Sequence, residues 1–320
     1  MKILGIETTC DETSAAVVEN GRRVLSNVVV SSLKEHSKYG GVIPEIASRR
    51  QLECIQPVVE EALADAGMTL KNIGAVAVAN HPGLIGSLLV GTSFASALSA
   101  SIRKPLIEVN HVHAHLYANF LLMPDGDGSK EIPALPAVGL IVSGGHTSLY
   151  LIKDFKNPRL IGQTVDDAAG EAYDKVARIL DLGYPGGPVI DELASQIPDT
   201  DLVFSCAPMK DSLNFSFSGI KTAALYHTQK HGKADRQKPQ IAHAFQKSVV
   251  TVLVDKALEA CRRHKAGTLL IGGGVAANSL LRAKLKETAE TQGVRFHCPP
   301  PVLCLDNGAM IAGLAYRLKQ

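Results

Sequence analysis

A pair of histidines four residues apart gives the sequence its strongest chemical signal. Residues 110–115 read Asn-His-Val-His-Ala-His, and in a helix His111 and His115 would share one face while His113 points elsewhere. Two imidazoles on one helix face can bind one metal ion. A zinc peptidase would carry Glu directly after the first histidine, and Val112 at that position argues against this class. A histidine-rich helix start that holds no metal is the alternative.

A third metal ligand would have to come from elsewhere in the chain. Asp306 is the best candidate because it lies just before the last predicted helix. It could equally act only as the N-cap of that helix. Two imidazoles and one carboxylate with open coordination positions suit Fe(2+), and Zn(2+) or Mn(2+) would also fit.

A glycine-rich segment at residues 272–278 could bind an anion. It follows a predicted strand and opens a predicted helix, so its backbone N–H groups could approach a phosphate closely. Asn278 could read a nucleoside or merely cap the helix. The spacing matches neither G-x-G-x-x-G nor a P-loop, so a dinucleotide site is weakly supported.

Acidic side chains precede a second glycine-rich turn, residues 183–188, which Asp191 follows. Helical spacing would place Asp167, Glu171 and Asp174 on one face. Most acidic faces are simply solvated. Their proximity to the turn makes contact with a ribose or a metal the competing interpretation.

The elements that must position these groups alternate between strands and helices, which indicates an α/β fold. The predicted strands cover residues 3–7, 15–19, 24–31, 75–79, 138–142, 149–152 and 269–271. The predicted helices cover residues 46–66, 84–101, 168–182, 240–263, 276–290 and 309–318.

One strand–turn–strand pattern occurs twice, at residues 5–18 and again at residues 140–152. Each turn is short, polar and rich in small residues, so its N–H groups could point at an anion. The repetition predicts two lobes facing each other across a cleft, as in the actin, Hsp70 and sugar-kinase superfamily. The alternative is two ordinary hairpins that happen to look alike.

We expect the first lobe to span residues 1–105, joined by the C-terminal helix at 307–320. The second lobe would span residues 106–306, with a helical, partly basic insertion at about 164–247. The later part of that insertion is rich in Lys and Arg, which indicates either a solvated loop or a surface that meets nucleic acid. The basic residues of this stretch are Lys221, Lys230, Lys233, Arg236, Lys238 and Lys247.

Composition sets the limits of these interpretations. The chain has 320 residues, of which 46% are hydrophobic, enough for a sizeable core. Its 33 basic and 31 acidic residues exclude a polycation that binds nucleic acid by bulk charge. The six scattered cysteines form neither a zinc ribbon nor a disulfide scaffold. We expect a cytoplasmic protein with no membrane span, because apolar runs stay short of the ~20 residues required.

Taken together, the motifs resemble the bacterial tRNA N6-adenosine threonylcarbamoyltransferase family, an assignment that covers essentially the whole chain. The matching segments are residues 5–13, 40–45, the pair His111 and His115, 142–147, 166–175, 184–188, 215–222, 272–278 and 306–307.

The resemblance implies an actin-like fold and one divalent metal, Fe(2+) in preference to Zn(2+), held by His111, His115 and Asp306. It also implies that a group of residues holds the nucleotide part of threonylcarbamoyl-AMP, the donor substrate. That group comprises Val142, Ser143, Gly144, Gly145, His146, Asp174, Gly187, Asp191 and Asn278. The acceptor that the resemblance implies is N6 of the adenosine 3′ of the anticodon (A37) in tRNAs that read codons beginning with A.

The donor is a mixed anhydride, so the protein must position the reactants and need not form a covalent intermediate. Glu12 or Asp11, at the first turn, could accept the proton that the attacking amine loses. The expected partners are tRNA, a smaller inactive paralogue and a small P-loop ATPase. The apolar stretch at residues 84–101 could form the paralogue interface or be buried within the lobe.

Three other functions remain as alternatives. An actin-like ATPase or small-molecule kinase would use the same nucleotide motifs but would not need the histidine pair. A metal-dependent peptidase is disfavoured by Val112. A binding or scaffold role would combine a bound metal with no turnover.

Overall fold

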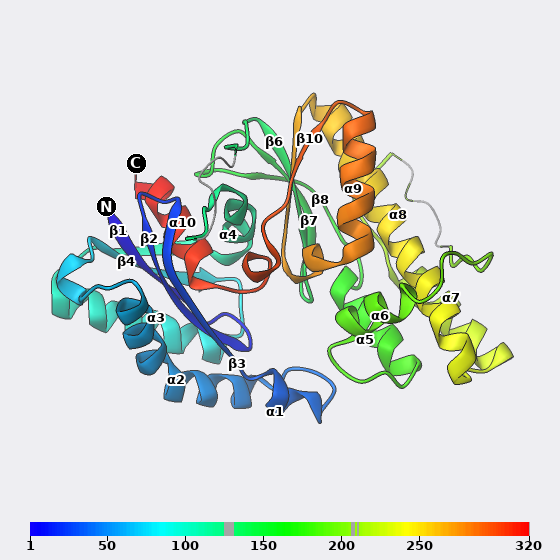
Figure 1. Cartoon of the computed structure of the whole chain (residues 1–320), viewed down its shortest axis with the longest axis horizontal. Helices are drawn as coiled ribbons and strands as arrows, with labels where there is room; N and C mark the ends of the chain where they lie inside the picture. The colour runs from blue at the N-terminus through cyan, green and yellow to red at the C-terminus, as the bar shows by residue number, and fades with distance from the viewer. Residues whose placement is uncertain (125–130, 206–208, 210, 320) are drawn as a thin grey trace. The chain divides into compact units, whose positions relative to one another are not determined.

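The computed structural model describes residues 1–124, 131–205, 209 and 211–319. The chain divides into two compact units (Figure 1). The first comprises Met1–Pro133 and Pro299–Gln320, and the second comprises Ala134–Cys298. The boundary expected near residue 105 therefore falls inside the first unit, because residues 106–110 form a strand of its sheet.

The first unit is built on a five-stranded mixed sheet. Its strands are β1 (Lys2–Glu7), β2 (Glu12–Glu19), β3 (Arg23–Ser31), β4 (Ala75–His81) and β5 (Leu106–Asn110). Their order is β3-β2-β1-β4-β5; β1–β2 and β2–β3 are antiparallel, whereas β4 and β5 extend the sheet in parallel. Strands β1 and β4 lie in the sheet interior and consist mainly of buried apolar residues, as expected for strands covered on both faces.

Helices cover both faces of this sheet (Figure 1). Helices α2 (Pro44–Asp65) and α3 (Ile85–Ile102) pack on one face and α10 (Gly308–Lys319) packs on the other. Gly67, at φ +62°, follows the end of α2, where glycine tolerates the left-handed conformation. The remaining helices are α1 (Leu33–Ser37) and α4 (His111–Tyr117), with short 3-10 turns at Leu70–Asn72, Ala118–Phe120 and Pro301–Leu303.

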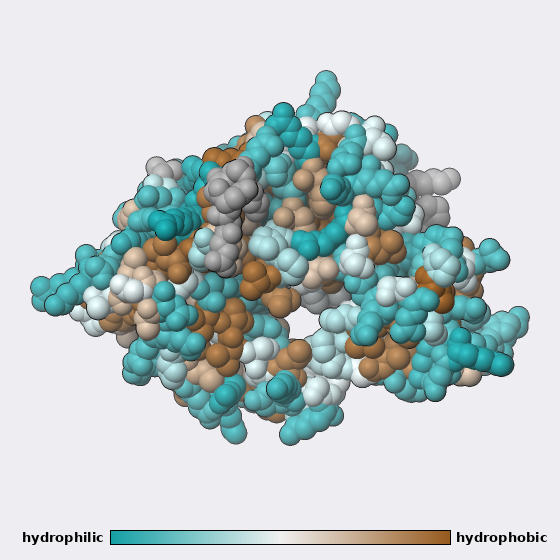
Figure 2. Space-filling model, viewed as in Figure 1, coloured by the Kyte–Doolittle hydropathy of each residue, from teal (hydrophilic) through white to brown (hydrophobic). Residues whose placement is uncertain are grey.

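Helix α3 is long and apolar enough to cross a membrane by length and composition alone, with a hydropathy of 1.5. It is the single helix of this kind in the described part of the chain. It packs against β4 and α2 through small residues one helical turn apart: Ser87, Gly91, Ala95 and Ser99. Much of its apolar surface nevertheless stays exposed, since only 22% of the helix is buried. On the face shown in Figure 2, hydrophobic patches are separated by hydrophilic surface.

The second unit repeats the strand order of the first. Its strands are β6 (Ala137–Val142), β7 (Thr147–Ile152), β8 (Arg159–Gln163), β9 (Thr268–Gly272) and β10 (Arg295–His297). The order is β10-β9-β6-β7-β8, with three antiparallel strands followed by two parallel ones, as in the first unit. The two predicted hairpins are β1–β2 and β6–β7, so the duplication inferred from them is present in the sheets.

The helices of the second unit gather residues from a long stretch of sequence. They are α5 (Ala169–Ile179), α6 (Gly186–Ala194), α7 (Ser218–His231), α8 (Lys238–His264) and α9 (Ser279–Thr291), with 3-10 turns at Asp235–Gln237 and Gly274–Ala277. Helix α8 packs against α6, α7 and α9, and α5 packs against α6. The region between β8 and β9 is thus largely helical, as predicted for most of residues 164–247.

Candidate functional site

The histidine pair lies on α4, directly after β5. Asn110 caps this helix, because its side chain accepts a hydrogen bond from the backbone N–H of His113. Both His111 and His115 are buried, with ring centroids 4.7 Å apart in an edge-on arrangement. His113 belongs to a different environment, where burial and the neighbouring His81 lower its pKa. The predicted sharing of one face by His111 and His115 is confirmed.

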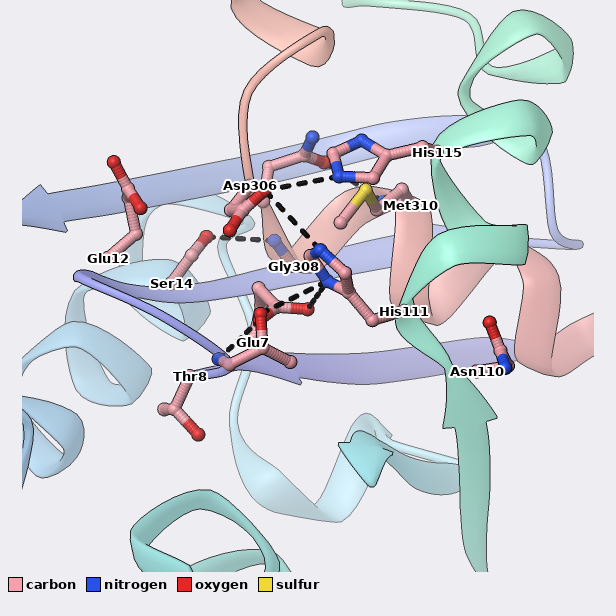
Figure 3. Close-up of polar contacts among 12 residues, drawn as sticks. Glu7, Thr8, Glu12, Ser14, Asn110, His111, His115, Asp306, Gly308 and Met310 are labelled. Carbon is pink, nitrogen blue, oxygen red and sulfur yellow. Dashed lines mark hydrogen bonds and ion pairs between the residues drawn. The ribbon is translucent and has the colours of Figure 1, made fainter. Parts of the chain in front are cut away.

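Asp306 lies beside both imidazoles (Figure 3). Its Oδ1 is 3.1 Å from His115 Nε2 and 3.6 Å from His111 Nε2. It does not cap the last helix: the Asn307 side chain accepts from Met310 N at 3.0 Å and performs that role. The alternative of Asp306 as an N-cap is therefore wrong, and its carboxylate is turned toward the histidines instead.

The three side chains fit a metal site. Their ligand atoms all lie within 4.8 Å of one another. Metal–ligand bonds of about 2.1 Å in a tetrahedral site put neighbouring donors about 3.4 Å apart, close to the two observed distances. Both nitrogens of His115 are buried without a hydrogen bond, although Asp306 is adjacent. Burying such groups without a partner is costly, and a cation shared with Asp306 would satisfy Nε2, the nitrogen that faces the carboxylate.

Glu7, at the end of β1, orients His111. Its carboxylate is fully buried; Oε2 lies 2.9 Å from His111 Nδ1, and Oε1 accepts from Thr9 N at 2.6 Å. Burial alone would lower the pKa of His111, but Glu7 and Asp306 outweigh it and raise that pKa to about 9. A carboxylate behind a ligating histidine fixes its tautomer, leaving Nε2 toward the metal. Sequence reasoning missed this role; the one available signal was an acidic residue at the end of an apolar strand.

Glu12 and Asp11 lie in the turn between β1 and β2. Buried Gln51 braces this turn by donating to the carbonyl oxygens of Cys10 and Glu12, at 2.9 and 3.0 Å. Burial, Asp306 and Asp11 together raise the pKa of Glu12 to about 10. Glu12 therefore holds a proton at neutral pH in this arrangement, and it must lose that proton before it can act as a base.

The predicted nucleotide-binding loop is the turn between β6 and β7, beginning at Val142 and ending at His146. Ser143 closes it: its N–H donates to the carbonyl oxygen of His146, and its Oγ accepts from His146 N. A Cβ added at Gly144 or Gly145 would meet no atom within 4 Å, so the loop has room for a ligand.

Glycines hold the elements behind this loop. At Gly170, the second residue of α5, a Cβ would lie 2.6 Å from the carbonyl oxygen of Ser143. At Gly273, with φ +93°, a Cβ would lie 2.4 Å from the carbonyl oxygen of Val142. Both approaches require glycine, and they fix the loop against α5 and the end of β9.

The other predicted nucleotide residues lie at helix starts in the same unit or hydrogen-bond to them. Asp174 accepts from Gly186 N at 2.7 Å and so anchors the start of α6, and burial raises its pKa. A Cβ at Gly187 would meet nothing within 4 Å. Asn278 caps α9 by accepting from Leu281 N at 2.9 Å, so the capping interpretation is confirmed.

Asp191 bonds to the start of α9, and Gln246 connects it to Asn278. Asp191 accepts from Ser279 N and Oγ at 2.9 and 2.8 Å. The Gln246 amide lies between Asp191 and Asn278, with a hydrogen bond of 2.9 Å to each. Gln246 was not among the nucleotide-binding residues predicted from the sequence, because nothing in the local sequence of a long helix marks one glutamine as buried.

The acidic face predicted on residues 167–174 differs in the structure. Helix α5 begins at Ala169, so Asp167 precedes it and bonds instead to Lys175 and Lys221, each at 2.6 Å. Glu171 pairs with Lys175 at 2.8 Å. These two carboxylates are neutralised by lysines, and only Asp174 of the three contacts the start of α6.

Comparison with solved structures identifies the fold. Component A of (R)-2-hydroxyglutaryl-CoA dehydratase from Acidaminococcus fermentans is 14% identical, with a TM-score of 0.56 over 99% of this chain and 98% of that chain. A HypF structure is 15% identical, with a TM-score of 0.62 over 98% of this chain and 46% of that chain. These likenesses confirm the predicted actin-like α/β fold.

Comparison of sequences identifies the family. The model of the family described as tRNA N6-adenosine threonylcarbamoyltransferase matches residues 23–313. A relative of that name from Syntrophus aciditrophicus is 49% identical over 98% of this chain and 90% of its own length. Another, from Symbiobacterium thermophilum, is 50% identical over 99% of this chain and 91% of its own length. This chain therefore belongs to the tRNA N6-adenosine threonylcarbamoyltransferase family and is a transferase.

Proposed function

We propose that the protein transfers the threonylcarbamoyl group from threonylcarbamoyl-AMP to N6 of A37, in tRNAs reading codons that begin with A. Family membership supports transfer to tRNA adenosine. The observation that carries the finer proposal is the convergence of His111, His115 and Asp306, brought together from α4 and the start of α10. Neither an actin-like ATPase nor a kinase needs such a group.

In this proposal, His111, His115 and Asp306 hold one divalent metal, Fe(2+) or Zn(2+). Such an ion, when bound, acts as a Lewis acid that orients the donor and polarises its carbonyl. Glu7 keeps the His111 ring in place, and Asn110 fixes the first turn of α4.

The nucleotide part of the donor binds in the second unit. Backbone groups of the Ser143–His146 turn bind its phosphate, and Asp174, Gly187, Asp191 and Asn278 surround the nucleoside. The open space at Gly144, Gly145 and Gly187 supports this arrangement. The donor is an already activated anhydride, so holding it in a fixed orientation is the main contribution that the proposal asks of these residues.

The proton released by the attacking amine passes to Asp11 or Glu12. Their shared turn is held rigidly by Gln51. Because the pKa of Glu12 is raised, a positive charge nearby is needed to keep it ionised.

The partners are tRNA, a smaller inactive paralogue and a small P-loop ATPase, in the cytoplasm. Exposed apolar side chains on α2 and at the start of α3 (Leu52, Ile85 and Leu89) support a protein interface there. In the basic stretch, ion pairs already engage Lys221, Lys233, Lys238 and Lys247. We therefore assign its tRNA contact chiefly to Lys230 and Arg236.

The decisive experiment is reconstitution with the partners, threonine, bicarbonate, ATP, the adenylate-forming enzyme and unmodified tRNA. Mass spectrometry of the nucleosides should show threonylcarbamoyladenosine. His115→Ala should lower its yield about a hundredfold, since a metal contributes several kcal/mol. His113→Ala, on the same helix outside the cluster, is the matched control. Absence of threonylcarbamoyladenosine from the complete mixture, together with ATP hydrolysis by the purified protein alone, would favour the ATPase alternative and contradict the proposal.

A further inference from the structure

We propose that Gln246 is a positioning residue that sets Asp191 and Asn278 for the nucleoside and thereby enforces selection of a ribonucleotide. This inference rests on the proposed function, because it assigns nucleotide binding to those two residues. Gln246 lies on α8, far in sequence from both.

The amide of Gln246 is held at both ends. Its Nε2 donates to Asp191 Oδ1, and its Oε1 accepts from Asn278 Nδ2, each at 2.9 Å. The hydroxyl of Tyr173 approaches the same Oε1 at 3.5 Å. Four helices therefore meet at one side chain: α5 through Tyr173, α6 through Asp191, α8 itself and α9, which Asn278 caps.

Burial makes this arrangement specific. Gln246 is 3% exposed, Tyr173 1% and Asn278 8%. Polar groups excluded from water must find protein partners, and rotation of the Gln246 amide would break its buried hydrogen bond to Asn278 and its part-buried one to Asp191 at once. The network thus has one low-energy arrangement before any ligand arrives.

The chemistry requires an amide at this position. A carboxylate such as Asp191 only accepts hydrogen bonds, and the Asn278 amino group only donates them. One side chain that donates to the first and accepts from the second must carry both functions. Glutamine does so, whereas Glu loses the donor and Met loses both.

Counting partners shows what remains for the ligand. A carboxylate offers about four acceptor sites. Three donors already face Asp191: Gln246 Nε2, Ser279 N and Ser279 Oγ, the last two from one residue. The remaining site is on Oδ2, which accepts only from Ser279 N among the residues that the structure describes, and it suits a hydroxyl donor such as that of a ribose. Asn278 keeps one amino hydrogen for the same ligand.

The test uses calorimetric titration of the purified full-length protein with AMP and with 2′-deoxy- and 3′-deoxy-AMP. The variants are Gln246→Met, which keeps the length, and Gln246→Glu, which keeps the shape. Gln240→Met, exposed on the same helix, is the matched control. Thermal melting of each variant reports whether the fold is intact.

We expect Gln246→Met to lower AMP affinity about tenfold or more, comparable to losing one or two charge-assisted hydrogen bonds. In this variant the ratio of the affinity for AMP to the affinity for the weaker-binding deoxy analogue should fall toward one. Gln246→Glu should bind AMP as weakly as Gln246→Met at about pH 8. Its AMP affinity should recover as pH falls, because one proton is then shared between the new glutamate carboxylate and Asp191. A merely structural glutamine would not produce this pH profile, and neither the wild type nor Gln240→Met should show it.

Two failures are distinguishable. If the wild type binds none of the nucleotides, the proposed donor site is wrong and this inference falls with it. If the wild type binds AMP and both Gln246 variants match Gln240→Met in affinity and sugar preference, only the Gln246 inference is overturned. Should Gln246→Met melt too low to titrate, the pH profile of Gln246→Glu decides alone.

Discussion

At the scale of single residues, Glu7 orients His111, one of the proposed metal ligands, without belonging to the proposed ligand set itself. It touches His111 Nδ1 and lies on the side of the imidazole away from Asp306. We predict that Glu7→Gln lowers metal affinity about 10–100-fold, the usual effect of removing a carboxylate behind a ligating histidine. Titration of the metal-free protein with Zn(2+) or Co(2+) measures it.

The control for this prediction is Glu19→Gln, on the neighbouring strand β2, where Glu19 pairs with exposed Arg23. Equal metal affinity in both variants would mean that Glu7 does not act on the site through His111.

Glu12 gives a prediction about pH. Its pKa rises from 4.5 to about 10 on folding, so the metal-free fold penalises its ionised form. The free energy of unfolding therefore has its full contribution from protonated Glu12 below about pH 4.5. That contribution is lost as pH rises toward about 10. Gln is neutral in both states and takes up no proton on folding, so Glu12→Gln should raise the melting temperature of the metal-free protein at about pH 8. A stabilisation of about 1 kcal/mol would correspond to about 2–4 °C.

Two features make this measurement decisive. The difference between Glu12→Gln and wild type must vanish near about pH 4, where both side chains are neutral. The same substitution should reduce transfer to tRNA about tenfold or more if Glu12 accepts the amine proton. A lower melting temperature at about pH 8 would show that folding does not disfavour the ionised form of Glu12.

At the scale of elements, a substitution in the Ser143–His146 turn can test ligand binding without disturbing the fold. Gly144→Ala adds a Cβ into open space, so the free energy of unfolding should change by less than about 0.5 kcal/mol. The same Cβ would occupy room reserved for the ligand, and AMP affinity should fall about tenfold. Gly267→Ala, where a Cβ also meets nothing, is the control and should leave AMP affinity unchanged.

The elements also show how far sequence reasoning reaches. Interior strands such as β1 and β6 were predicted because both of their faces are buried and their apolar runs are continuous. Strand β5 was missed because it lies at a sheet edge, with Glu108 exposed. Helix α6 was missed because it opens with Gly-Gly-Pro, residues that in isolation predict a turn.

The same limit applies to the site. The histidine pair could be predicted because four residues make one helical turn, a local relation. Glu7, which contacts His111, is 104 residues away from it in the sequence. Gln246, which contacts Asn278, is 32 residues away from it. Only the tertiary fold brings such groups into contact, so no local pattern could reveal them.

At the scale of the whole molecule, duplication produced two similar units whose equivalent turns differ. In the first unit the turn is filled by protein: Thr8 donates to the carbonyl oxygen of Ser87, and a Cβ at Gly91 would lie 2.1 Å from Thr8 Oγ1. In the second unit Gly144 and Gly145 face open space. One unit therefore carries the histidine–aspartate cluster, and the other carries the open turn that we propose as the anion-binding loop.

This division predicts separate stabilisation of the two units. All three proposed metal ligands belong to residues 1–133 and 299–320, and all proposed nucleotide ligands belong to residues 134–298. A ligand at about 100 times its dissociation constant stabilises what it binds by about 2.7 kcal/mol. In hydrogen exchange followed by mass spectrometry, Zn(2+) should protect chiefly α4 and the start of α10, whereas AMP should protect chiefly the Ser143–His146 turn and the starts of α6 and α9. His115→Ala should abolish the first pattern and preserve the second. Protection by Zn(2+) confined to the second unit would refute the assignment of the metal to His111, His115 and Asp306, because none of these residues lies there.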